Sequence, residues 1–137
     1  MKKILDNDFV LVNFDETCNA IIAAWKKPTT SETYRLTILE IIDSLSLYHA
    51  TACILDIHQL GLVSTEDRKW FQDDILPMAV TRGLKRIATV TSSDVFSQVN
   101  FESVKEAASR NDVEIEMDYF DEMNAAMSWI TNTAVPV

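Results

Sequence analysis

Residues 51–70 read TACILDIHQLGLVSTEDRKW, and this stretch decides the fold. Residues 51–57 are almost entirely apolar, which is the pattern of a strand covered on both of its faces. A loop over residues 58–63 follows, and Ser64 then offers a hydroxyl that can cap the next helix. A strand, a loop and a helix start in this order predict a parallel strand with Asp56 at its carboxyl end, where sites gather in open α/β sheets.

The chain before this stretch predicts a hairpin and then a long helix. Residues 8–14 and 18–25 read as two strands joined by a short polar turn, so we expect them to pair. A helix is expected from about Ser31 to Tyr48, with Thr30 or Ser31 as its cap. The apolar residues of this helix recur at spacings of three and four, as in a helix laid on a sheet. They are Tyr34, Ile38, Ile41, Leu45 and Tyr48, widened by Leu39 and Ile42.

The chain after it predicts further strands and helices. Residues 86–91 are another apolar strand, whereas residues 113–120 alternate acidic with apolar side chains, as a strand at the edge of a sheet does. A helix is expected from residue 93 or 94 to about residue 110. Another follows Asp121, with Met123, Ala126, Met127 and Ile130 as its buried stripe. Residues 131–137 show no pattern and are expected to form a flexible tail.

These elements predict an α/β fold of order ββαβαβαβα. The helix after Ser64 should be kinked or ended by Pro77 and stopped by Gly83, which gives four to five helices in all. Strands that alternate with helices after a hairpin predict a mixed, mostly parallel sheet of five strands, one of them antiparallel. A chain of 137 residues fits a single domain over residues 1–137 that needs no disulfide or structural metal.

Composition narrows the classes of function. The formal net charge is −9, and the basic residues occur only as isolated pairs, so we expect no binding to nucleic acid. No run of about 18 apolar residues is present, so we expect no transmembrane insertion. No export signal is apparent at the start, and we therefore expect a cytoplasmic protein in which Cys18 and Cys53 are reduced and pack within strands.

The residue pattern contains no recognisable catalytic or metal-binding motif. Only two glycines occur, which excludes the glycine-rich phosphate loops, and no Gly-x-Ser-x-Gly elbow is present. Cys53 and His58 would lie about 17 Å apart on opposite sides of an extended strand, too far for a nucleophile and its base. His49 and the cysteines have no recognised ligand spacing for zinc. We therefore expect no enzyme activity, no metal and no cofactor.

Several short motifs resemble, in their order and spacing, those of one known family. They are Trp25-Lys26-Lys27 before Tyr34-Arg35, Leu55-Asp56, Ser64-x-Glu66-Asp67 with Trp70, Arg86-Ile87-Ala88, and Phe120-Asp121 with Ala126-x-x-Trp129-Ile130. The family is the STAS-like superfamily of anti-sigma-factor antagonists, and the likeness is closest to a bacterial subgroup described as Sec14-like. The resemblance covers nearly the whole chain and implies a STAS-like fold.

The resemblance also implies a regulatory site at the start of the second helix. In antagonists of this family a partner kinase phosphorylates a serine there, and counting from Asp56 places Thr65 at that position and Ser64 just before it. Asp67 stands where the family has glycine, which departs from the pattern and adds negative charge beside a phosphate. The alternative is a plain helix cap, for which Ser64 alone suffices.

The sequence leaves two functions open. In the first, the protein is a non-catalytic interaction or regulatory module that self-associates or binds a protein partner. Its surface would lie on the second helix, where Trp70, Phe71, Ile75 and Met78 exceed what one stripe on a sheet requires. Alternatively, Pro77 divides this helix into two parts, each with its own core face.

The second function is the binding or sensing of a small apolar ligand or a lipid. The Sec14-like resemblance suggests this function. The site would be a cleft near the carboxyl ends of the strands, lined by aromatic residues such as Trp70, Phe71 and Phe96.

Overall fold

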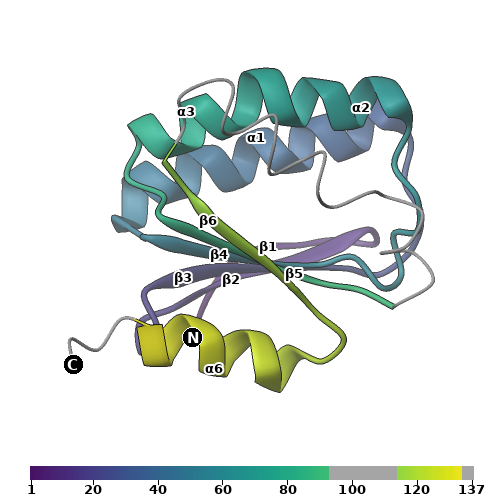
Figure 1. Cartoon of the computed structure of the whole chain (residues 1–137). Coiled ribbons are helices and arrows are strands. Elements are labelled where there is room, and N and C mark those ends of the chain that lie inside the picture. The colour runs from purple at the N-terminus through teal and green to yellow at the C-terminus, as the bar shows by residue number, and fades with distance from the viewer. Residues whose placement is uncertain (93–113, 134–137) are drawn as a thin grey trace.

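A six-stranded sheet lies between two layers of helices in the computed structural model, which describes residues 1–92 and 114–133 (Figure 1). The strands lie side by side in chain order, and only β2 runs antiparallel to its neighbours. The α/β class and the mixed, mostly parallel sheet are confirmed. The predicted five strands and the order ββαβαβαβα were wrong, because an additional strand precedes the expected hairpin. The predicted four to five helices were also not found, since the described residues form three helical segments. The strands are β1 (Lys2–Asp6), β2 (Val10–Asp15), β3 (Ala20–Trp25), β4 (Ala52–Asp56), β5 (Arg86–Val90) and β6 (Glu116–Phe120).

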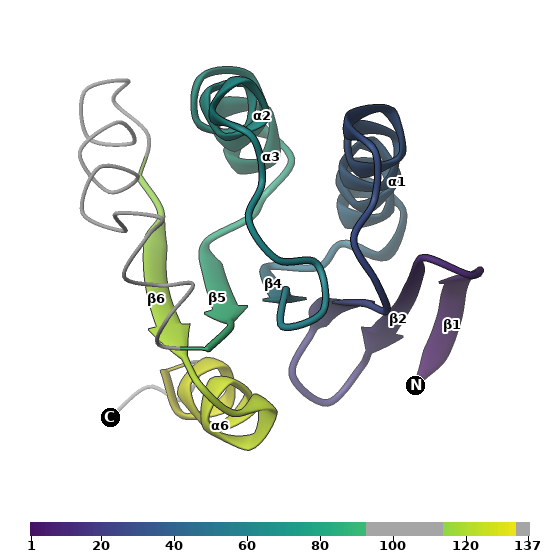
Figure 2. The ribbon, with the colours of Figure 1, turned by 90° about the vertical axis from the view of Figure 1, so that its right-hand side faces the viewer.

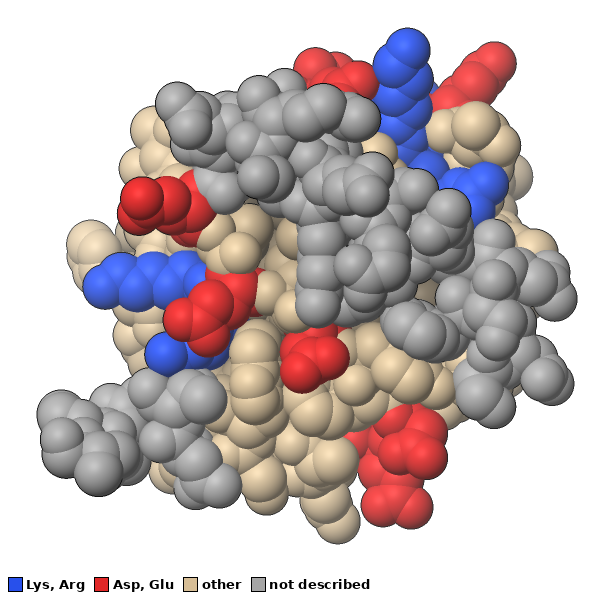
Figure 3. Space-filling model, in the orientation of Figure 1, with Lys and Arg blue, Asp and Glu red and all other residues tan. Residues whose placement is uncertain are grey.

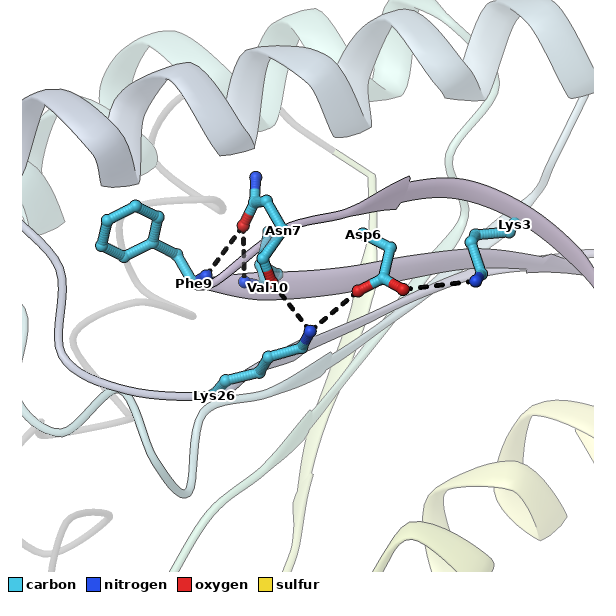
Figure 4. Close-up of polar contacts among 6 residues, drawn as sticks. All are labelled: Lys3, Asp6, Asn7, Phe9, Val10 and Lys26. Atoms are coloured by element: carbon cyan, nitrogen blue, oxygen red, sulfur yellow. Dashed lines mark hydrogen bonds and ion pairs between the residues drawn. The ribbon is translucent and has the colours of Figure 1, made fainter.

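The strand that sequence reasoning missed is β1, at one edge of the sheet. Most of its side chains are exposed, so it lacks the apolar alternation that marks a strand. It pairs with β2, and polar contacts of Asn7 and of Lys26, the residue after β3, support this edge (Figure 4). The side chain of Asn7 closes the turn by accepting hydrogen bonds from two backbone N–H groups at 2.8 and 3.0 Å. The Lys26 Nζ donates to Asp6 Oδ1 at 2.8 Å and to the Asn7 carbonyl at 2.7 Å.

Helices cover both faces of the sheet (Figure 2). On one face lie α1 (Ser31–Tyr48) and a continuous helical segment made of α2 (Thr65–Trp70), the π-helical turn η1 (Phe71–Ile75) and α3 (Leu76–Thr81). On the other face lies α6 (Met123–Thr133), so residues 131–133 are helical rather than part of a tail. The helix expected over residues 93–110 and the rest of the expected tail, residues 134–137, lie outside the described residues.

Two hydrophobic clusters lie on the two faces of the sheet, because strand side chains alternate between them. On β3, Ile21, Ala23 and Trp25 join the cluster beneath α1 and the α2–η1–α3 segment, whereas Ala20 and Ile22 face α6. The strand β6 is at the other edge and keeps its acidic side chains exposed, as the alternation of residues 113–120 predicted.

The bounds of α1 agree with the sequence-based prediction. Its cap is Thr30, whose side chain accepts from the Thr33 N–H at 3.2 Å. Most of the predicted stripe is buried, but Tyr48 is only partly so and stacks on Phe14 at a centroid distance of 4.9 Å. The prediction was wrong for Leu39, which is 39% exposed because it lies toward the outer side of the helix.

Pro77 does not end the helical segment, which was one of the two effects expected of it, the other being a kink. Proline has no N–H and its ring crowds the carbonyl four residues earlier, so a regular helix cannot pass unchanged. The wider turn η1 ends at Ile75, two residues before Pro77, and helix then continues to Thr81. The predicted stop at Gly83 is confirmed by its φ of +101°, which a residue with a side chain rarely adopts.

Both cysteines are buried free thiols that pack as small apolar groups. Cys53 lies in β4 as expected, but Cys18 lies in the turn between β2 and β3 rather than in a strand. Burial raises the pKa of the Cys53 thiol to about 12. Burial, and then the negative charge of Asp15, raise the pKa of Cys18. Both thiols therefore stay protonated at neutral pH.

Candidate functional site

An apolar cavity of about 120 Å³, open in part to the surface, lies between the sheet and the helices at the carboxyl ends of β3, β4 and β5. It is the place in an open α/β sheet where ligands gather. Strands supply its floor, and α1, the loop after β4 and the α2–η1 segment supply its walls. Its described lining is Trp25, Tyr34, Ile38, Leu55, Ile57, Leu60, Gly61, Val63, Arg68, Phe71, Gln72, Ile87, Thr89 and Met117.

The loop after β4 closes one side of this cavity. The N–H groups of Leu60 and Gly61 both donate to the Ile57 carbonyl, at 3.2 and 3.3 Å, which folds the loop back over the strand end. Leu60 is thereby buried. Gly61 takes a φ of +78°, a conformation that suits glycine. The two glycines that excluded a phosphate loop therefore act as backbone turns, and Gly61 shapes the cavity wall.

The Trp25 indole is the polar group of most consequence in the lining. Trp25 is 3% exposed, and its Nε1 is buried with no hydrogen-bond partner among the described residues. A buried N–H without an acceptor costs roughly 1–3 kcal/mol, so such groups are rare in folded proteins. A donor is thus left unused in a side chain that lines a cavity.

An ion pair between a buried acid, Asp67, and a partly exposed base, Arg35, lies beside the cavity and joins α1 to α2. The Asp67 Oδ1 accepts from Arg35 Nε at 2.7 Å and from Ser31 Oγ at 2.8 Å. Burial alone would raise the pKa of Asp67, but the hydrogen bonds and the charge of Arg35 outweigh it and hold that pKa below its usual range. Asp67 is therefore a buried, paired acid, whereas Glu66 beside it is exposed.

Trp70 packs against this ion pair rather than lining the cavity. The Arg35 guanidinium lies 4.8 Å from the centroid of the Trp70 ring, a cation–π contact. The Tyr34 ring meets the Trp70 ring edge-on, at a centroid distance of 6.3 Å. Tyr34 also lies tilted against the Trp25 ring, at a centroid distance of 6.0 Å. A row of three aromatic rings thus connects the surface at Trp70 with the cavity wall at Trp25.

The structure separates the residues that were expected to form one apolar surface on the second helix. Phe71 lines the cavity, as the ligand-binding alternative expected. Ile75 is 2% exposed and belongs to the core, so no partner can reach it. Trp70 is partly buried, and Met78 is 38% exposed. Phe96, the other expected lining residue, lies outside the described residues.

The helix start holds Ser64 and Thr65 in different roles. Ser64 caps α2, since its Oγ accepts from the Asp67 N–H at 3.1 Å. Thr65 is exposed and its Oγ1 accepts from Arg68 Nη2 at 3.2 Å. The Asp56 Oδ1 contacts the His58 ring at 2.9 Å within its own loop. Phosphorylation of Thr65 stays a prediction.

A second, more polar hollow of about 260 Å³ lies where α1 and α2 begin. Hydroxyl groups of Thr29, Thr30, Ser31 and Ser64 line it together with Asp67. All but Thr29 already serve the helix caps or the Arg35–Asp67 pair. We therefore treat this hollow as part of the framework that fixes the two helices.

Other kinds of site find no support in the described part of the chain. No group of three His, Cys, Asp or Glu side chains in residues 1–92 and 114–133 could hold a metal ion. No helix in those residues is long and apolar enough to cross a membrane. On the face drawn in Figure 3, described Lys and Arg side chains are interspersed with acidic and uncharged ones rather than gathered into a wide basic surface.

Comparison with known proteins adds no relative. No family model, no curated protein and no solved structure matches the chain significantly. The STAS-like resemblance accordingly stays a prediction, and the cavity geometry is the basis for a functional proposal.

Proposed function

We propose that the protein binds a small apolar molecule in the cavity at the carboxyl ends of β3, β4 and β5. The observation that carries the proposal is the cavity itself, with its mostly apolar lining and the unpaired Trp25 N–H beside it. Ligand sites are typically of this kind, apolar with a few placed polar groups that fix orientation. This makes the alternative function of the sequence analysis the better supported one.

The cavity volume limits the size of the ligand. An engineered protein cavity of roughly 150 Å³, lined by aliphatic and aromatic side chains, stays dry and binds benzene. At about 120 Å³ the present cavity suits a single ring or a branched chain of about six carbon atoms. A whole lipid would not fit, but the end of an acyl chain would.

A titration with benzene, followed through the methyl signals of the protein, tests this proposal. We expect shifts for methyl groups that line the cavity, in Ile57, Leu60 and Ile87. The matched control is within the same spectrum, because Ile22 and Ile54 lie on the other face of the sheet and should not shift. Equal shifts on both faces, or none on either at saturation of benzene in water, would remove the basis of the proposal.

Protein binding through α1 is the second candidate, and it moves the expected interaction surface from the second helix to the first. Leu36, Leu39 and Leu47 are 60, 39 and 72% exposed, and exposed Glu40 and Asp43 lie between Leu39 and Leu47 along the helix. Exposed apolar side chains flanked by acids fit a partner segment that is apolar and basic. We propose such a segment, rather than a second copy of this acidic chain, as the occupant.

Two synthetic amphipathic peptides distinguish this candidate, one of leucine and lysine and the other of leucine and glutamate. We expect the lysine peptide to shift the methyl signals of Leu36, Leu39 and Leu47, and the glutamate peptide to leave them unchanged. If both peptides or neither shift them, charge complementarity is not the basis of binding on α1. Light scattering on the protein alone would reveal self-association, which would instead favour a second copy as the occupant.

Both candidates are for binding rather than catalysis, as the sequence predicts. Within the STAS-like resemblance, ligand occupancy of the cavity would regulate the helix face above it, since α1 contributes to both. We further propose a cytoplasmic location, because buried reduced thiols at Cys18 and Cys53 suit a reducing compartment.

A further inference from the structure

Arg68 is the one charged residue in the described lining of this otherwise uncharged cavity. Its side chain is partly buried and lines the cavity wall on α2. Its described polar contact is the hydrogen bond to the neutral Thr65 hydroxyl at 3.2 Å, and none of the described carboxylates forms an ion pair with it. The neighbouring arginine of this region, Arg35, is by contrast neutralised by Asp67.

The rest of the described lining contains no negative charge to balance that of Arg68. The chain has 21 acidic residues against 12 basic ones, yet no described carboxylate lines the cavity. Asp67, the nearest acid along the chain, turns its carboxylate to Arg35 and Ser31 instead. The polar lining groups besides Arg68 are uncharged, in Gln72, Thr89, Tyr34 and Trp25. A site with a cation and no anion discriminates in favour of negatively charged ligands.

Gln72 adds a donor close to Arg68. The two residues are four positions apart on the same helical segment and both line the cavity, so their side chains lie on one face. A guanidinium binds the two oxygens of a carboxylate with two parallel hydrogen bonds, and an amide NH₂ can supply another. The apolar floor beneath them accommodates a hydrocarbon group.

We infer that the ligand is a small carboxylic acid, with its apolar part in the cavity and its carboxylate at Arg68 and Gln72. This inference rests on the proposed function and names the chemical class of ligand for that same cavity. The size limit above then indicates a short branched or cyclic acid.

Calorimetric titration with 4-methylpentanoate and its amide tests the inference, because the two probes differ chiefly in charge. We expect the acid to bind the wild-type protein about tenfold to a hundredfold more tightly than the amide, since hydrogen bonds to charged groups are the stronger ones. Arg68→Gln should remove this advantage, so that the acid and the amide bind with about equal affinity. Lys69→Gln, which removes an exposed cation one residue away, should change neither affinity.

The possible results distinguish a failure of the acid preference from a failure of the proposed ligand binding. If the acid and the amide bind equally, or if Arg68→Gln and Lys69→Gln weaken the acid to the same extent, the acid preference is overturned and the apolar cavity function survives. If neither probe binds and benzene does not bind, the proposed function itself fails. Acetate provides a further control, and tight binding of acetate would contradict a site that depends on the apolar part.

Discussion

Replacing Asp67 with alanine is expected to destabilise the fold by about 2–3 kcal/mol at neutral pH. Removal of one partner from a fully buried ion pair costs roughly 3–5 kcal/mol. The expected cost here is smaller because only one partner of this pair is buried. The Asp67 side chain is 4% exposed but that of Arg35 is 39% exposed. The change would also release Ser31, and it would free the guanidinium that lies over the ring of Trp70.

Urea unfolding of the wild type and of two variants measures this effect. Asp43→Ala is the matched control, because Asp43 also pairs with an arginine, Arg82, but its side chain is 74% exposed. Exposed pairs contribute roughly 0.2–1 kcal/mol, so this variant should stay close to the wild type. If Asp67→Ala and Asp43→Ala lose the same stability, the Arg35–Asp67 pair does not hold α1 and α2 together as we describe.

The contribution of Asp67 depends on pH in a defined direction. Its pKa is lower in the folded chain than the value of about 3.9 for an unfolded one, so folding favours the ionised form. The resulting stability is fully present above about pH 4–5 and is lost as the pH falls through the folded pKa. The difference in stability between the wild type and Asp67→Asn should therefore shrink in acid. A difference that grows below about pH 4 would contradict the assignment.

Replacing Thr89 with phenylalanine is expected to abolish ligand binding while the protein stays folded. Thr89 lies on β5 two residues after Ile87, and both line the cavity. An aromatic ring at this position would occupy space that the ligand needs, and strands accept aromatic residues well. We expect the affinity for benzene and for 4-methylpentanoate to fall by more than about tenfold, since each depends on burial of its apolar part.

Thr81→Phe is the matched control for this variant. It introduces the same ring at an exposed position at the end of α3, away from the cavity. Its ligand affinity should equal that of the wild type, and circular dichroism should show both variants folded. Unchanged binding to a folded Thr89→Phe protein would place the ligand elsewhere.

Much of the fold could be predicted because it follows from local patterns. The apolar spacing of α1 fixed its length, and the hydroxyl of Thr30 marked where it begins. The mixed sheet with a single antiparallel strand followed from a hairpin succeeded by alternating strands and helices. The acidic alternation of β6 correctly placed that strand at an edge.

What could not be predicted depends on contacts between distant segments. The strand β1 lacks the apolar alternation that marks a strand; it pairs with β2, and Lys26 and the turn at Asn7 add polar contacts. Burial of Asp67 depends on Arg35, which is 32 positions away in the chain. From the sequence alone, an acid next to Glu66 is expected to be exposed to solvent, because the sequence does not show that α1 and α2 pack together. Leu39 shows the reverse, since an apolar side chain near the edge of a stripe can still face outward.

The candidate site was located in part by sequence reasoning. The loop after Asp56 and the aromatic Phe71 were expected near the strand ends, and both contribute to the cavity wall. The signal of Arg68 was missed, because an arginine beside a lysine on a polar helix start looks like ordinary surface. Only the absence of an acidic partner among the described residues distinguishes it from Arg35.

Diffraction from crystals pressurised with xenon tests the central claim most directly, since xenon enters dry apolar cavities without needing polar contacts. A bound xenon atom between Leu55, Ile87 and Phe71 in the wild type, and its absence from Thr89→Phe, is the result that we predict. The claim would be contradicted if this space held ordered water or the protein's own side chains and took up no xenon.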